Sequence, residues 1–145
     1  MNLHFTISEF NISGEHIPEE VADKILEHHI VPMVVVREQM GEAVWPSLKS
    51  GYRPFWWEKK YGRSGKSQHC FGEQESGEFD PGAKGAVDWT ADDLDRLEEL
   101  IMELTPYTRI ARYKNFIHCD YKAQDGKRYY FKSGDDSKWQ FIKHL

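Results

Sequence analysis

The segment from residue 115 to residue 122, NFIHCDYK, constrains the fold more than any other part of this chain. Side chains of a β-strand alternate between its two faces, so Ile117 and Cys119 would point one way and His118 and Asp120 the other. The pattern therefore predicts a strand with one face in the core and an imidazole beside a carboxylate on the other face. A satisfied polar pair on a half-exposed strand is the simpler explanation of that second face.

The other patterns place helices before most of the strands. Pro32 either kinks the first helix or opens a second one, which Gly41 would end. Thr90 is the expected N-cap of a later helix with one apolar stripe. The expected helices span residues 17–29, 32–40 and 91–104, and the expected strands span residues 44–50, 85–89, 109–115, 116–122 and 127–132.

Two connections complete the expected organisation. Residues 55–84 are rich in glycine and charge and lack periodicity, so we expect a long loop there. A turn at Asp125-Gly126 is expected to join the last two strands. The fold class is therefore α+β, with a small antiparallel sheet and N-terminal helices packed against it, in a single domain of residues 1–145.

The composition argues against several classes of function. The formal net charge of −5 gives no general attraction to nucleic acids or anionic lipids. No apolar run is long enough to cross a bilayer, so we expect no membrane insertion. The N-terminus, MNLHFTISEF, lacks the pattern of a secretory signal, so we expect a cytoplasmic protein. We also expect a monomer. Two cysteines provide no disulfide framework.

The chain has seven histidines, and most of them have ordinary explanations. His28 and His29 are neighbours in a predicted helix and do not share a face, so we expect roles on the helix surface. Three more lie in terminal segments with no acidic residues arranged around them: His4, His16 and His144. The remaining candidates for chemistry are His69, Asp88 and His118.

Two imidazoles and one carboxylate suit a zinc ion that keeps one position open for water. Cys70 and Cys119 directly follow the two histidines and are the obvious competing ligands. If His118 faces a metal ion from a strand, however, Cys119 faces the core. We therefore expect both thiols to be core residues. Taken singly, His69 would be a polar loop residue and Asp88 a capping carboxylate.

Four short motifs occur along the chain in the order SGYRP, SQHCFGE, GAVDW and FIHCDY. In this order they resemble the zinc D-alanyl-D-alanine carboxypeptidase and L-alanyl-D-glutamate endopeptidase family, which includes phage endolysins and shares its fold with the hedgehog signalling domain. The resemblance implies that His69, Asp88 and His118 hold Zn²⁺, and that Arg53 polarises the scissile carbonyl. A salt bridge to a nearby acid is the other explanation of Arg53.

The chain departs from the family's pattern at two places. Eighteen residues separate His69 from Asp88, where the family usually has a short spacer. The excess, residues 73–84, can loop out at small entropic cost, either shaping a substrate cleft or forming a surface excursion. The acid that many members carry three residues before the last histidine is replaced by Asn115, which cannot take a proton. Asp120 is then the expected general base, because it shares a strand face with that histidine.

Other roles for these groups remain open at this stage. Asp120 could instead orient a ligand, or pair with Lys122 or Arg112. Acids of the insertion are less constrained candidates for the general base: Glu73, Glu75, Glu78 and Asp80.

Together these features predict a zinc-dependent peptidase that hydrolyses peptide bonds in the stem peptides of bacterial peptidoglycan. The resemblance implies an endolysin-like protein that acts on the cell wall after release from the cytoplasm. The alternative is a non-catalytic, metal-containing binding module on the same fold, which Asn115 keeps open. A structural phage protein with an incidental His/Asp cluster would bind no stoichiometric metal.

Overall fold

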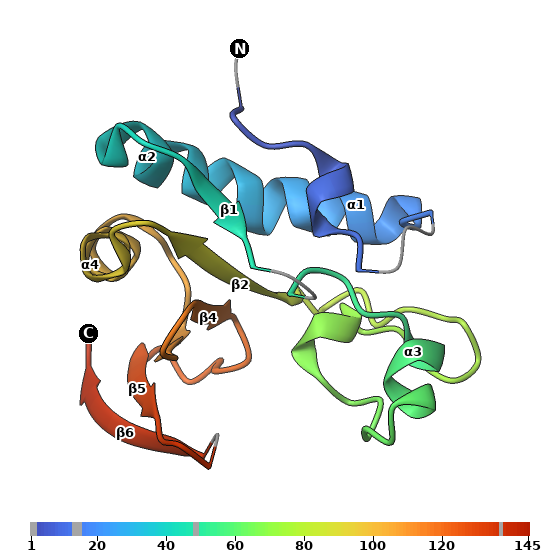
Figure 1. Ribbon diagram of the computed structural model, residues 1–145. Coiled ribbons are helices and arrows are strands. Elements are labelled where there is room, and N and C mark those ends of the chain that lie inside the picture. Colours follow the sequence, from blue (N-terminus) through green and yellow to red (C-terminus); the bar gives the residue numbers. More distant parts are fainter. Residues whose placement is uncertain (1–2, 13–15, 48–49, 137) are drawn as a thin grey trace.

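In the computed structural model, which describes residues 3–12, 16–47, 50–136 and 138–145, a six-stranded sheet packs against helices (Figure 1). The α+β class expected from the sequence is confirmed. The helical elements are η1 (Ile7–Phe10), α1 (Glu19–Ile25), η2 (Leu26–Ile30), α2 (Val31–Met40), α3 (Phe55–Lys60), η3 (Gln68–Cys70) and α4 (Leu94–Leu104). The strands are β1 (Val44–Pro46), β2 (Ala86–Ala91), β3 (Arg109–Arg112), β4 (Ile117–Asp120), β5 (Tyr129–Ser133) and β6 (Trp139–His144). No helix in the described part of the chain is long and apolar enough to cross a membrane.

The N-terminal helices form one nearly continuous run beside β1 (Figure 1). Pro18 directly precedes α1, and Pro32 lies in the first turn of α2. The π-helical turn η2 joins the two helices. Gly41, with a φ of 67°, ends α2 as expected. Pro32 therefore opens a second helical segment.

The sheet has the strand order β1-β2-β4-β3-β5-β6 and is antiparallel except at one pair. β4 lies antiparallel between β2 and β3, whereas β5 pairs in parallel with β3. The expected hairpin of the β4 and β5 segments is wrong, because both edges of β4 are already taken. Arg128 holds the connection before β5 by donating hydrogen bonds to the backbone carbonyls of Met102, Thr105 and Tyr107.

Two local expectations are corrected by the structure. Thr90 is not a helix cap, because it lies within β2 and pairs with Trp45 of β1. Asp93 caps α4 instead, and its side chain accepts a hydrogen bond from the backbone N–H of Arg96. The segment expected to be one long loop, residues 55–84, contains the short helices α3 and η3.

The two faces of the sheet differ in chemistry, as the alternation in β4 predicted. Ile117 and Cys119 belong to the hydrophobic core beneath the sheet, whereas His118 and Asp120 lie on the opposite face. Both cysteines, Cys70 and Cys119, are free thiols and buried, so the expectation that they are core residues is confirmed.

β2 is fixed to the core by its own apolar residues. Trp89 is fully buried and packs edge-on against Phe5 and Phe10, with ring centroids 5.3 and 5.6 Å away. Val87 is also fully buried in the core. Because Val87 and Trp89 point into the core, Asp88 between them must point to the polar face.

Candidate metal centre

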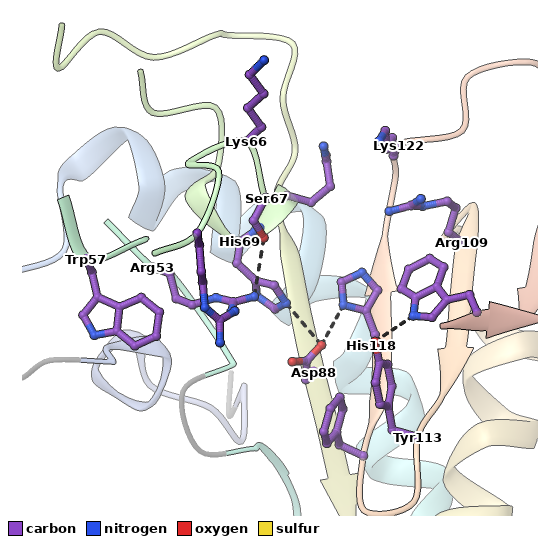
Figure 2. Close-up of a pocket in the computed structure, with 14 residues that line it drawn as sticks. Arg53, Trp57, Lys66, Ser67, His69, Asp88, Arg109, Tyr113, His118 and Lys122 are labelled. Atoms are coloured by element: carbon purple, nitrogen blue, oxygen red, sulfur yellow. Dashed lines mark hydrogen bonds and ion pairs between the residues drawn. The ribbon is translucent and has the colours of Figure 1, made fainter. Parts of the chain in front are cut away.

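Three side chains from distant parts of the chain converge on the polar face of the sheet (Figure 2). His69 comes from η3, Asp88 from β2 and His118 from β4, and the strand register places Asp88 opposite His118. Asp88 Oδ1 lies 3.3 Å from His69 Nε2 and 2.8 Å from His118 Nδ1. One ligand atom of each residue lies within 4.8 Å of the other two. These three residues, called the trio below, are buried and could hold a metal ion.

In each histidine of the trio, the ring nitrogen that points away from Asp88 makes a hydrogen bond to another group of the protein. His69 Nδ1 donates a hydrogen bond to the carbonyl of Gly51 at 3.0 Å, and His118 Nε2 donates to Asp120 Oδ2 at 2.7 Å. Metal-binding histidines almost always donate their other ring N–H to a carbonyl, a carboxylate or water in this way. The nitrogens that face Asp88 are therefore the ones available to a metal ion. The donor set fits a metal site.

Backbone geometry around η3 fixes the position of His69. Ser67 caps η3 by accepting a hydrogen bond from the N–H of His69 at 3.2 Å, and the carbonyl of His69 accepts one from the N–H of Arg53 at 2.8 Å. Gly51 lies so close to Phe10 that a Cβ there would be 2.3 Å from the Phe10 carbonyl oxygen. Only glycine fits where the backbone offers its carbonyl to His69.

The charges of the trio shift its protonation equilibria. Burial alone would lower the pKa of His118, but hydrogen bonds to Asp120 and Asp88, together with their negative charges, raise it to about 9. Burial lowers the pKa of His69, and the charge of Asp88 only partly opposes this effect. Burial would raise the pKa of Asp88, but the charge of His69 and hydrogen bonds from both histidines hold it well below its usual value. The carboxylate of the trio is therefore ionised.

Asp120 lies behind His118 and has no oxygen free to act on water. Its side chain is fully buried, and both carboxylate oxygens accept hydrogen bonds from Arg109. The backbone N–H of Lys122 also donates to it, at 2.9 Å. Burial would raise the pKa of Asp120, but the hydrogen bonds from Arg109 and His118 hold it well below its usual value. This environment does not suit the general base expected from the sequence, and it favours the alternative in which Asp120 orients a ligand, His118.

The other candidate bases do not face the trio. Asn115, which stands at the position of the family's acid and cannot take a proton, is exposed in the turn between β3 and β4. Glu73 accepts hydrogen bonds from the hydroxyl of Tyr52 and from the backbone N–H of Phe55. None of residues 73–84, all of which the structure describes, lines the cavity in front of the trio. The insertion is therefore a surface excursion with respect to this cavity. The candidate acids that do not line the cavity are Glu73, Glu75, Glu78 and Asp80.

A cavity of about 600 Å³ opens in front of the trio, and Arg53 lies in its wall (Figure 2). Arg53 Nη2 lies 3.5 Å from Ser67 Oγ, and Nη1 lies 3.9 Å from Glu58 Oε2. The nearby acid that the sequence left as an alternative is thus present. It does not remove Arg53 from the cavity, so both explanations of this arginine remain compatible with its position.

Aromatic residues complete the cavity walls, and sequence reasoning did not single out Trp139 among them. Trp139, from the edge strand β6, packs its ring 5.1 Å from the ring of His118 and donates a hydrogen bond to the hydroxyl of Tyr113 at 2.7 Å. Trp57 of α3 lines the opposite wall. Arg109 was also missed, although a hairpin centred between residues 114 and 115 pairs it with Asp120.

His29 contradicts the expectation that it lies on a helix surface, because it is fully buried. Its Nδ1 accepts from the hydroxyl of Tyr107 at 2.8 Å, and its Nε2 donates to the carbonyl of Lys84 at 2.9 Å. Trp89 Nε1 donates to the same hydroxyl at 3.1 Å. Burial lowers the pKa of His29 to about 3, so this imidazole is neutral. We call His29, Tyr107 and Trp89 the His29 cluster.

No protein-family model matches this chain, and no curated protein or solved structure matches it. The resemblance carried by the four motifs therefore stays a prediction. What the trio can do follows from its chemistry: two imidazole nitrogens and one carboxylate oxygen present a cation site with one side facing a cavity.

Proposed function

We propose that this chain is a zinc-dependent peptidase that hydrolyses peptide bonds of bacterial peptidoglycan stem peptides, in the manner of phage endolysins and D,D-peptidases. The observation that carries the proposal is the convergence of the trio beside an open cavity. Two nitrogen ligands, one oxygen ligand and a vacant fourth position are typical of catalytic zinc sites in hydrolases. The four motifs in family order support the choice of substrate.

Each residue around the trio has a role in this proposal. A zinc ion held there would act as a Lewis acid towards a peptide carbonyl and the attacking water. Arg53 would donate hydrogen bonds to the carbonyl oxygen as negative charge develops on it. Asp120 would accept a hydrogen bond from Nε2–H of His118, which leaves Nδ1 as the ligand nitrogen. Asp120 is in this view a positioning residue.

A non-catalytic metal-binding module is the second candidate. Among the described residues that line the cavity, Asp88 is the only carboxylate. Because the trio employs Asp88 as a ligand, and because Asp120 is occupied by Arg109 and His118, the cavity offers no separate carboxylate for proton transfer. This feature favours metal-dependent binding without hydrolysis.

Metal analysis and an activity assay separate these candidates. The purified protein is expected to hold one zinc ion, and His118→Ala is expected to abolish this binding, whereas the control His144→Ala keeps it. The zinc-loaded protein should release new amino groups from purified peptidoglycan, lose this activity with a chelator and regain it with added zinc. Stoichiometric zinc without amine release would support the binding module. No zinc in the wild-type protein would contradict both candidates.

A further inference from the structure

The cavity in front of the trio is strongly cationic, although the whole chain has a net charge of −5. Apart from Asp88, every charged side chain in its lining is positive. The cationic residues are Arg53, Arg63, Lys66, Arg109 and Lys122. A positive pocket on a negative protein is a local feature that recruits negative ligands.

Nearby acids neutralise only part of this positive charge. Asp120 pairs with Arg109. Glu58 is shared by two guanidinium groups, because its Oε2 lies 3.9 Å from Arg53 Nη1 and 3.5 Å from Arg63 Nε. Among the described residues, no carboxylate lies within ion-pair distance of the ammonium groups of Lys66 and Lys122.

Arg53 supplies an independent sign that an acceptor is missing. The residue is only 9% exposed, yet its Nε has no hydrogen-bond partner among the described residues. A buried N–H without an acceptor is costly, and in native proteins such a group usually meets water or a ligand. The Nη atoms of Arg53 make only long contacts, 3.5 Å to Ser67 Oγ and 3.9 Å to Glu58 Oε2, so the guanidinium that lines the cavity keeps donors for a ligand bound there.

The cationic groups lie on two separate walls. Arg53 and Lys66 lie on the His69 side of the trio, and Arg109 and Lys122 lie on the His118 side (Figure 2). The first wall comes from the segment around α3 and η3, and the second from β3 and the end of β4. Two separated positive walls suit two separated negative groups better than one compact anion.

We propose that the cavity selects a peptide with two carboxylates, one on each side of the peptide bond that lies over the trio. This specificity rests on the proposed function for its peptide character. Lys66 and Arg63 take the carboxylate on the His69 side, and Lys122 takes the carboxylate on the His118 side. Charge-assisted hydrogen bonds from ammonium and guanidinium groups to carboxylates provide the affinity.

The experiment measures peptide binding to the metal-free full chain, which keeps binding separate from hydrolysis. The probes are four short peptides: one with acidic residues on both sides of the central bond, two with a single acidic residue on either side, and one neutral. Calorimetry is expected to show about tenfold tighter binding for each added carboxylate. Binding of the doubly acidic peptide should weaken as salt rises from about 50 to about 500 mM.

Charge-removing variants assign the walls. Lys66→Gln and Lys122→Gln should each weaken binding of the doubly acidic peptide about threefold to tenfold, and each should affect only one of the singly acidic peptides. Lys60→Gln and Lys143→Gln remove exposed lysines that do not line the cavity and should leave binding unchanged. Retained melting temperatures show that the variants fold.

Several outcomes would overturn the inference. Equal affinity for the neutral and the doubly acidic peptide would do so, as would equal behaviour of cavity and control lysine variants. Inorganic phosphate that competes as strongly as the doubly acidic peptide would also contradict two separate carboxylate sites. Zinc titration of the wild-type protein distinguishes the two proposals. If the protein binds no zinc, the peptidase proposal is contradicted. If it binds no zinc but still prefers the doubly acidic peptide, the inference that the cationic walls select two carboxylates is supported.

Discussion

The trio and the His29 cluster both contain buried histidines, but they use their ring nitrogens differently. In the His29 cluster each imidazole nitrogen has a protein partner, the hydroxyl of Tyr107 or the carbonyl of Lys84. In the trio, each histidine has one nitrogen hydrogen-bonded to another protein group and one nitrogen directed at Asp88 beside a cavity. The first arrangement is closed and neutral, and the second can accept a cation.

Burial by itself therefore does not identify a ligand histidine in this protein. His29 and His69 are both buried, and burial lowers the pKa of each. The two histidines differ at one ring nitrogen: in His29 it contacts the hydroxyl of Tyr107, whereas in His69 it faces the carboxylate of Asp88 beside the cavity. A carboxylate in the gap between two imidazoles is stabilised by them in the metal-free protein, and it would be the third ligand of a metal ion held there.

Removing a ligand should have the largest effect on this contrast. His69→Ala and His118→Ala are each expected to weaken zinc binding by more than roughly 100-fold, the upper range for loss of a mere outer partner. His29→Gln, in the closed cluster, should leave zinc affinity unchanged. Competition titration with a chromogenic chelator measures all three. Unchanged affinity in His118→Ala would show that the trio is not the site.

Breaking the closed cluster should instead cost stability. His29→Ala leaves the Lys84 carbonyl and the Tyr107 hydroxyl without a partner and opens a cavity, so we expect the free energy of unfolding to fall by about 3 kcal/mol. His28→Ala, on the partly exposed neighbour, is expected to cost less than about 1 kcal/mol. Urea denaturation compares the two. Similar losses in both variants would contradict the structural role given to His29.

Asp120→Asn tests the positioning role of this residue. The variant removes the negative charge that holds His118 Nε2–H and pairs with Arg109, so zinc affinity is expected to fall about 10-fold to 100-fold. The exposed Asp125→Asn serves as the control and should change nothing. If zinc affinity stayed at the wild-type value while turnover collapsed, Asp120 would be the general base after all.

The two clusters should respond to pH in opposite directions in the metal-free protein. His29, with a pKa of about 3 against a usual value of 6.5, stays neutral in the fold, so its contribution to stability declines as pH falls below about 6.5. His118, with a pKa of about 9, is charged in the fold, so its contribution is complete below about 6.5 and is lost as pH rises through about 9.

Matched variants isolate these two contributions. Between about pH 7 and pH 5, the free energy of unfolding of the wild type should fall by about 2 kcal/mol more than that of His29→Gln. Between about pH 7 and pH 10, it should fall by a similar amount more than that of His118→Gln. Urea denaturation at the three pH values measures both. An unchanged acid slope in His29→Gln would argue against a neutral His29 in the fold.

The smallest effect is expected for the thiols. Cys119→Ala removes one buried sulfur from the core side of β4 and should lower the free energy of unfolding by about 1 kcal/mol, with zinc stoichiometry unchanged. Cys70→Ala should likewise keep zinc. Loss of zinc in either variant would mean that a thiol is a ligand and that the strand-face argument is wrong.

Local patterns predicted much of the fold. The period of two in the β4 segment separates Ile117 and Cys119 from His118 and Asp120, as the structure confirms. The position of Gly41 predicted the end of α2, because the left-handed backbone that glycine favours is a local property. The parallel pairing of β5 with β3 escaped prediction, since strand neighbours depend on which edges remain unpaired.

The candidate site divides in the same way. Residue types and strand faces named His69, Asp88 and His118, and the structure brings them together. The hydrogen-bond partners of Asp120 and His29 could not be predicted from the pattern of a single helix or strand. Arg109 binds Asp120 from a neighbouring strand, and Tyr107 and the Lys84 carbonyl contact His29 from distant segments. These contacts arise between segments whose relative positions depend on packing of the whole core.

The amino-acid sequence alone determined the α+β class, the faces of β4 and the two residue types of the trio, because these follow from period, local backbone chemistry and metal preference. Only the tertiary structure decided that His29 is closed off, that Asp120 is fully occupied and that cationic side chains surround the trio. Burial, hydrogen-bond partners and the field in a cavity are properties of spatial neighbours, and these neighbours lie far apart along this chain.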